Sequence, residues 1–322
     1  MNNVKIAEAI RYNARRWWTG HNLPWQFSGS LPNTMEFAQE VQAFQLAHGL
    51  PADGKLGPDT EAAARAEKPS PTPDEDRLRP WRGVGMWLWQ MSKCGGGDFY
   101  RIAARLGDAG IFYALVKIAD GRSPMKPNVA ALSPLKVALD ERGIGLGGWA
   151  WVRHDNPEAE AELAARLVAD HGLDSFVVNA EKDTLGQHAL ARRYMARLRE
   201  KLPAGVPVAL SSYKFPKAHP TLPWREYLDA CDAGMPQVYL WGSKPSAQVA
   251  RSAQEWGAYG KPIIPTGPLW PKGGATPETV GRFIEDQKNA VGVNFWDYQH
   301  ATDGLWAALQ TRTHLRPPSS IL

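Results

Sequence analysis

The chain has 322 residues, of which 43% are hydrophobic, and this is enough for two domains of ordinary size. Its net charge of +4 is only weakly basic, and no run of Lys and Arg forms a patch, so nucleic acid is not an expected partner. No stretch of about 18 apolar residues is present, so membrane insertion is not expected either.

The first residues, MNNVKIAEAIRYNARRWW, show no apolar stretch followed by a small-residue cleavage site, so a secretion signal is not predicted. Cys94 and Cys231 lie far apart and fit neither a disulfide framework nor a metal motif. We therefore expect two buried free thiols and maturation in a reducing compartment.

Helices are predicted in the first part of the chain. Apolar residues recur near helical spacing over Val4–Ala14, and a second helix is predicted over Thr34–His48. Gly49 follows it in the position where a glycine often ends a helix. The segment Asp53–Thr60 is typical of a turn before a new helix, with Thr60 as a candidate cap.

The stretch from Glu40 to Ala63, EVQAFQLAHGLPADGKLGPDTEAA, resembles the type 1 peptidoglycan-binding domains. The pattern V-x-x-F-Q, G-L, D-G-x-x-G-x-x-T is matched by Val41, Phe44, Gln45, Gly49, Leu50, Asp53, Gly54, Gly57 and Thr60. The resemblance implies that residues 1–68 form a module that binds peptidoglycan. Most of these residues also have a purely structural interpretation, as core and turn positions of a small helical fold.

A Pro-rich, charged segment follows, KPSPTPDEDRLRP, which has no apolar period. Such a composition is typical of an extended linker. The sequence therefore predicts a peptidoglycan-binding domain at 1–68, a linker at 69–80 and a second domain at 81–322.

Strand and helix patterns alternate in the second domain. Strands are predicted at Gly83–Met91, Phe112–Asp120, Gly145–Arg153, Ser175–Asp183, Val206–Lys214, Met235–Gly242, Pro262–Trp270 and Gly292–His300. Helices are predicted near 98–109, 133–142, 157–171, 187–201, 224–232, 247–258, 277–289 and 303–311. Eight such pairs predict a (β/α)8 TIM barrel.

A doubly wound open sheet is the alternative fold. It usually carries a Gly-rich phosphate loop after its first strand. Gly95, Gly96 and Gly97 follow the first predicted strand, but without the G-x-G-x-x-G spacing, so the barrel is preferred.

The fourth predicted strand contains a candidate catalytic acid. Because side chains alternate along a strand, Asn179, Glu181 and Asp183 should share the face toward the barrel interior. A carboxylate at the end of an apolar strand is costly unless it has a task or a partner. Catalysis by Glu181 is one interpretation, and an ion pair with Lys117 of the second strand is the other.

The same parity selects polar and aromatic residues near other strand ends. They are Trp149, Trp151, Tyr213, Gln237, Tyr239, Trp241, Asn294, Trp296 and Tyr298. Rings that stack on sugar faces, together with amides that bond hydroxyl and acetamido groups, suit a polysaccharide. The same rings could instead fill the top layer of the barrel.

An acid closing strand four and a Gln-x-Tyr on strand six resemble the barrel lysozymes and lysins of glycoside hydrolase family 25 and, more loosely, family 18, including phage-encoded lysins. This implies that Glu181 is a general acid. The chain departs from these families at Asn179, where they place an Asp two residues before the Glu, and an Asn cannot be a nucleophile.

Most glycosidases need a second carboxyl group. Asp183 is the first candidate, followed by Asp120 and by Asp297, whose parity is opposite. In the substrate-assisted exception one acid suffices, because the acetamido oxygen of the substrate attacks. No H-E-x-x-H spacing and no G-x-S-x-G elbow is present, and neither a metal nor a cofactor is expected.

The leading hypothesis is therefore a monomeric peptidoglycan hydrolase of endolysin type, bound to the wall by its N-terminal module. Without a signal it would be made in the cytoplasm and reach the wall through phage lysis or delivery in a particle. The alternative is a non-catalytic wall-binding part of a phage tail or injection device, whose barrel has a degenerate site.

Overall fold

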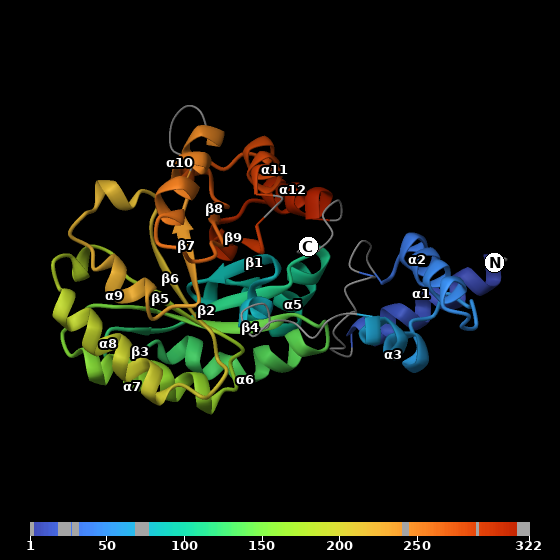
Figure 1. Cartoon of the computed structure of the whole chain (residues 1–322), viewed down its shortest axis with the longest axis horizontal. Helices are drawn as coiled ribbons and strands as arrows, with labels where there is room; N and C mark the ends of the chain where they lie inside the picture. Colours follow the sequence, from blue (N-terminus) through green and yellow to red (C-terminus); the bar gives the residue numbers. More distant parts are fainter. Residues whose placement is uncertain are drawn as a thin grey trace.

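The computed structural model describes residues 3–18, 27, 32–67, 77–239, 245–287 and 290–313. Within them, one sheet contains eight parallel strands and a short antiparallel strand, β3 (Ser123–Pro124), which pairs with β2 (Figure 1). The parallel strands are β1 (Gly83–Leu88), β2 (Tyr113–Asp120), β4 (Gly145–Trp151), β5 (Phe176–Asn179), β6 (Val208–Tyr213), β7 (Ala233–Gln237), β8 (Thr266–Pro268) and β9 (Gly292–Trp296).

The sheet is closed. Strand β1 pairs with β2 on one side, where Gly85 is aligned with Tyr113, and with β9 on the other, where Gly85 is aligned with Asn294. A doubly wound sheet would keep two open edges, so the predicted (β/α)8 barrel is confirmed. Each parallel strand overlaps one of the eight predicted stretches.

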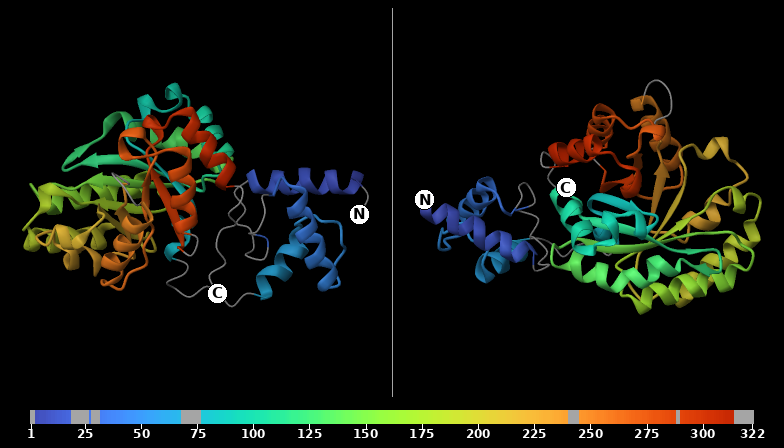
Figure 2. Two further views of the ribbon diagram at one scale, coloured as in Figure 1. Left: turned by 90° about the horizontal axis from the view of Figure 1, so that it is seen from above. Right: turned by 180° about the vertical axis from the view of Figure 1, so that it is seen from behind.

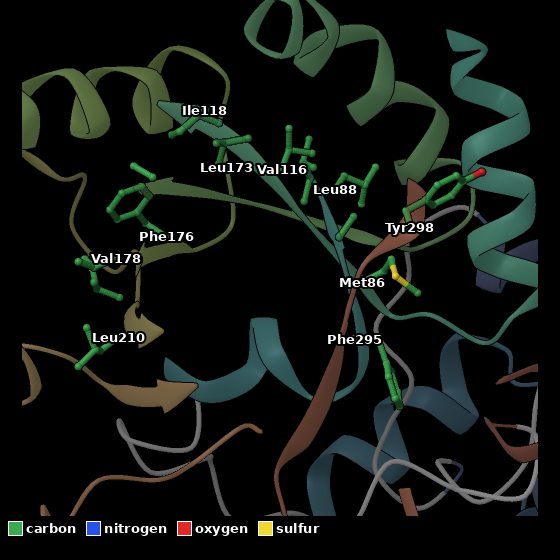
Figure 3. Packing of buried hydrophobic residues seen from close by; sticks show 14 of the residues in the cluster. Met86, Leu88, Val116, Ile118, Leu173, Phe176, Val178, Leu210, Phe295 and Tyr298 are labelled. Carbon is green, nitrogen blue, oxygen red and sulfur yellow. The ribbon is translucent and has the colours of Figure 1, made fainter. Parts of the chain in front are cut away.

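One helix follows each parallel strand, and the helices surround the barrel (Figure 2). They are α5 (Phe99–Asp108), α6 (Lys126–Asp140), α7 (Pro157–Asp170), α8 (His188–Lys201), α9 (Trp224–Leu228), α10 (Pro245–Gly257), α11 (Pro277–Asp286) and α12 (Asp303–Thr313). Strand side chains such as Met86, Val116 and Phe176 join helix residues in a large buried cluster (Figure 3). This outer layer holds the strands in place beneath the loops at their ends.

Helix α6 differs from its prediction, because it begins at Lys126 and not near residue 133. Pro134 lies inside it, and a proline normally indicates a helix start or break because it lacks the N–H. Asn128, Ala131 and Leu132 are all buried in the preceding turns. Their burial outweighs the local signal of the proline, which the sequence pattern could not show.

The barrel interior is filled by a second cluster that includes Trp81, Tyr113 and Trp149. Trp81 is fully buried and donates from Nε1 to Ser175 Oγ at 3.0 Å. A Cβ at Gly85 would lie 2.1 Å from the Tyr113 ring, so this strand position has to be glycine. The filled interior leaves the C-terminal ends of the strands as the place for a site.

The barrel unit begins before residue 81. Leu78 belongs to the interior cluster, and Arg77 forms an ion pair with Asp232 at 2.8 Å. The end of the predicted linker therefore packs on the barrel, whereas residues 68–76 lie outside the described part of the chain. The domain boundaries otherwise remain a prediction.

The N-terminal helices are α1 (Asn3–Trp18), α2 (Met35–Ala47) and α3 (Pro58–Glu67). They have a small core of their own, formed by Phe27, Phe37, Val41, Leu56 and Ala64, against which Phe44 packs. The expected core positions Val41 and Phe44 are confirmed. Gly49 and Gly54 both have positive φ, as tight turns require.

Gln45 explains much of the motif in this unit. Its Nε2 lies about 3 Å from Asp53 Oδ1, Lys55 O and Thr60 Oγ1, and its Oε1 accepts from Gly54 N at 2.8 Å. The expected helix cap at Thr60 is wrong, because α3 begins at Pro58 and Thr60 is buried against Gln45. These residues hold the turn against α2.

Cys94 and Cys231 are free and buried, as expected. Burial raises the pKa of both thiols to about 12, so neither is a reactive thiolate. Among the described helices, none has the length and apolar character that a membrane span requires.

The buried side chain of His154 is expected to make the stability of the fold depend on pH. It is 4% exposed, and its ring nitrogens contact Gln187 Oε1 at 3.0 Å and Tyr227 Oη at 2.8 Å. Burial lowers its pKa from 6.5 to about 4, against a smaller opposing effect of the Gln187 bond. Between these values the unfolded chain binds more protons than the folded one, so stability falls as pH decreases from 6.5 to about 4.

We expect protonation of His154 to lower the free energy of unfolding by up to about 3 kcal/mol over that pH window, at roughly 1.4 kcal/mol per pH unit. Urea unfolding at several pH values, compared between the wild type and His154→Gln, measures the difference. His171→Gln is the control for loss of a histidine outside the core. An equal slope in the wild type and His154→Gln would contradict the assignment.

Candidate active site

Four polar side chains meet at the C-terminal ends of β5, β6 and β7. Gln237 Nε2 lies 2.9 Å from both Asn179 Oδ1 and Glu181 Oε1. It also lies 3.3 Å from Ser211 Oγ, and Asn179 Nδ2 donates to Glu181 Oε1 at 3.2 Å. Strand register causes this meeting, because Asn179 is aligned with Ser211 on the adjacent strand. Three predicted site residues are thus in direct contact.

Glu181 lies two residues beyond the end of β5 and is half-buried. Burial raises the pKa of its carboxyl, while the hydrogen bonds from Gln237 and Asn179 oppose the rise and the nearby charge of Asp183 adds to it. Both amide donors contact Oε1. Oε2 is therefore the oxygen on which a proton can be carried toward a ligand.

A chain of charged groups lies beside this cluster, at the ends of β2, β4 and β5. Arg153 bonds Asp120 Oδ1 at 2.5 Å and Asp183 Oδ2 at 3.3 Å. Trp151 Nε1 donates to Asp183 Oδ2 at 2.7 Å. Burial opposes ionisation of Asp120, but hydrogen bonds from Lys117 and Arg153 hold its pKa below the ordinary value. Asp183 is thus a hydrogen-bond acceptor that orients the Trp151 ring.

The ion pair between Lys117 and Glu181, which was the alternative interpretation of this acid, is not formed. Lys117 Nζ pairs with Asp120 Oδ2 at 2.7 Å and lies 5.3 Å from the centre of the Trp149 ring. Asp120 follows Lys117 closely along β2, where the register shifts between Lys117 and Ala119. Glu181 forms no ion pair within the described residues, so its charge is opposed mainly by amide dipoles.

Half-buried aromatic residues lie at the strand ends around these groups. Those predicted from parity are Trp151, Tyr213, Tyr239 and Trp296. Tyr213 stacks on His219 with ring centres 3.6 Å apart, and Tyr239 meets Trp270 edge to face at 4.9 Å. Trp241 was also predicted here and lies outside the described residues.

The C-terminal ends of the strands around Glu181 form the mouth of the barrel. Three other residues that parity predicted there lie away from it. Trp149 and Asn294 are buried in the barrel interior, where Asn294 Oδ1 accepts from Trp87 Nε1 at 2.6 Å. Tyr298 lies in the outer cluster (Figure 3), because the chain turns after β9 and strand alternation stops. Its ring packs on that of Trp306. Alternation of side chains predicts which residues face the barrel interior only as far as the strand extends.

Trp89, Arg153 and Trp270 were missed as site residues. Trp89 lies 6.2 Å from Trp296 between ring centres and is half-buried. Its signal was present, since it shares the inward parity of Trp87 at the end of the first predicted strand. Arg153 likewise shares the parity of Trp151, so alternation along the strand predicts an inward direction for both Trp89 and Arg153.

No group of three His, Cys, Asp or Glu side chains in the described parts of the chain is placed to hold a metal ion. The groups that the mouth presents include one half-buried acid, several amides, an anchored carboxylate and stacking rings. This combination fits proton donation to a polar, ring-containing ligand.

Residues 36–63 match the family model described as "Putative peptidoglycan binding domain", which confirms the resemblance predicted for this segment. No curated protein sequence matches the chain.

The barrel is similar to solved structures of glycan-active enzymes. The spore cortex-lytic enzyme SleL of Bacillus cereus has a TM-score of 0.54 and 8% identity, covering 72% of this chain and 74% of that chain. A chitinase from Bacteroides thetaiotaomicron has a TM-score of 0.58 and 9% identity, covering 73% of this chain and 97% of that chain. An endo-beta-1,4-mannanase from Thermotoga petrophila has a TM-score of 0.54 and 12% identity, covering 76% of this chain and 78% of that chain. At these identities the likeness shows the fold alone.

Proposed function

We propose that the protein is a glycoside hydrolase that cleaves the glycan strands of peptidoglycan, with the N-terminal unit binding the wall. The observation that carries the proposal is Glu181, a half-buried acid with a raised pKa, held by two amides at an aromatic barrel mouth. The match at residues 36–63 and the likeness to SleL and chitinase support the choice of a wall glycan.

Glu181 would act as the general acid. Its Oε2 would deliver the proton to the glycosidic oxygen as the bond from that oxygen to the anomeric carbon breaks. Asp183 is the proposed second carboxyl, and its bonds from Trp151 and Arg153 suit a base or a stabiliser of positive charge more than a proton donor.

The substrate-assisted route is the alternative within this function. The acetamido oxygen of the substrate would attack the anomeric carbon, and Asn179 would orient that acetamido group through its amide. Glu181 would then be the only carboxyl group that the bond cleavage requires. Release of reducing ends from purified peptidoglycan tests the function by either route.

We predict that residues 1–68 bind insoluble peptidoglycan without the barrel. The core around Val41 and the Gln45 network hold this unit together without barrel residues. In a sedimentation assay the fragment should pellet with purified wall. If it remains in the supernatant while the full chain sediments, wall binding belongs to the barrel.

A second candidate function is a non-catalytic wall-binding component, such as part of a phage tail or injection device. Asn179 favours it, because an amide replaces the carboxylate that the resembled families place two residues before the acid. For either function we propose that the partner is peptidoglycan, that the place of action is the wall, and that the chain acts as a monomer. Export by lysis or particle delivery stays a prediction.

A further inference from the structure

A second acid–base pair lies at the end of β9, separate from Glu181. His300 Nδ1 contacts Asp297 Oδ1 at 2.8 Å. The Asp297 side chain is fully buried, whereas 46% of the His300 side chain is exposed. The pair therefore connects an inaccessible carboxyl group to an accessible imidazole.

His300 is the charge partner of Asp297. Among the described residues, Asp297 Oδ2 is buried and accepts no hydrogen bond. Burial raises the pKa of Asp297, and the His300 contact opposes that rise. With Nδ1 facing Asp297 Oδ1, Nε2 is the nitrogen left for a ligand, and its N–H can donate to a carboxylate when both ring nitrogens carry a proton.

The pair stands at the end of a row of rings that leads out from the mouth. The Trp296 and Trp89 ring centres are 6.2 Å apart, and those of Trp89 and His300 are 6.3 Å apart. Burial raises the pKa of the Tyr239 phenol, and the charges of Glu181 and Asp297 both add to the rise. Asp297 and Glu181 therefore lie near the same phenol, and His300 lies at the edge of the same mouth.

Two of the cations on the other flank are already matched with carboxylates. Lys117 pairs with Asp120, and Arg153 pairs with both Asp120 and Asp183. An anionic ligand group would have to displace these partners. At His300 the carboxylate partner lies behind the ring, so an approaching anion meets the free nitrogen without competition.

We propose that His300, held from behind by Asp297, binds the carboxylate of an acidic substituent on a sugar that lies across Trp89 and Trp296. The inference rests on the proposed function, since it assumes that the mouth takes a wall glycan. In peptidoglycan such a carboxylate belongs either to the lactyl group of muramic acid or to its stem peptide. His300 would thus distinguish wall glycan from neutral chitin.

The test measures binding to the full chain carrying Glu181→Gln, so that cleavage does not interfere. Three ligands are titrated: the N-acetylglucosamine–N-acetylmuramic acid disaccharide, the same disaccharide with its stem peptide, and neutral chitobiose. The readouts are the dissociation constant and the NMR shift of the His300 imidazole, assigned with His300→Gln. We expect His300→Gln to weaken binding of the acidic disaccharide by about 10-fold and to leave chitobiose unchanged.

His300→Lys is the matched control, because its ammonium group supplies a cationic donor that glutamine lacks and should recover most of the preference for the acidic ligand. If only the peptide-bearing ligand loses affinity in His300→Gln, the recognised carboxylate is that of the peptide. The inference is overturned if all three ligands are affected equally, or if no acidic ligand shifts the His300 resonance. If either of these two results is obtained while the wild type cleaves glycan, the role of His300 is refuted and the proposed function still holds.

Discussion

Glu181→Gln is expected to lower glycan cleavage by about 10²–10⁴-fold, the usual contribution of a positioned proton donor. Gln has the same shape, and its carbonyl oxygen can accept the bonds that Asn179 and Gln237 donate to Oε1. Folding and wall binding should therefore stay unchanged. Reducing-end release from purified peptidoglycan, with thermal unfolding of both proteins, checks the two halves of this expectation.

The pH profile offers an independent view of the same group. The acid must carry its proton, so activity should fall as pH rises through the pKa of Glu181. Because burial raises that pKa, the fall should come at a higher pH than for an ordinary glutamate. A profile that falls in the range of an exposed glutamate would contradict the assignment.

Glu200→Gln is the matched control, since Glu200 is an exposed carboxylate on α8 that pairs with Arg197. It should leave both rate and profile unchanged. If Glu181→Gln keeps the wild-type rate, Glu181 is structural and Asp183 is the next acid to test. If no wall tested is cleaved by the wild type, the non-catalytic function is favoured, and Asn179 is its physical basis.

Gln45→Leu is expected to abolish wall binding and to lower turnover of insoluble wall by about 10²-fold or more, because linked modules raise local concentration by such factors. The substitution leaves the buried Gly54 N–H and Thr60 hydroxyl without their partner, at about 1–3 kcal/mol for each group. A small helical unit has little stability to spare. Cleavage of a small soluble glycan should not change.

Sedimentation with purified peptidoglycan and turnover of soluble and insoluble substrates measure the effect. Gln42→Leu is the control on the same helix, since Gln42 donates to Ala52 O at 3.2 Å and takes no part in the Gln45 network. It should bind wall like the wild type. Undiminished sedimentation of Gln45→Leu, with its helical unit shown to be unfolded, would place wall binding in the barrel.

The sequence alone predicted the fold and most of the side chains at the mouth. Strand and helix periods located all eight parallel strands, because each period is a property of a few consecutive residues. Parity then placed Asn179, Glu181 and Gln237 on the inward side, and their contacts confirm that they meet. The motif around Gln45 identified the N-terminal family by itself.

Only the tertiary structure decided which groups pair. Lys117 pairs with Asp120 and not with Glu181, and Tyr298 lies in the outer layer. Such outcomes depend on the register between strands and on where each strand ends, and neither is encoded in the period of one segment. The same reason applies to His300 and Asp297, because a turn after β9 buries one carboxylate and exposes its partner imidazole. Local sequence determines which side chains are available, and packing between distant segments determines which of them share a proton or a charge.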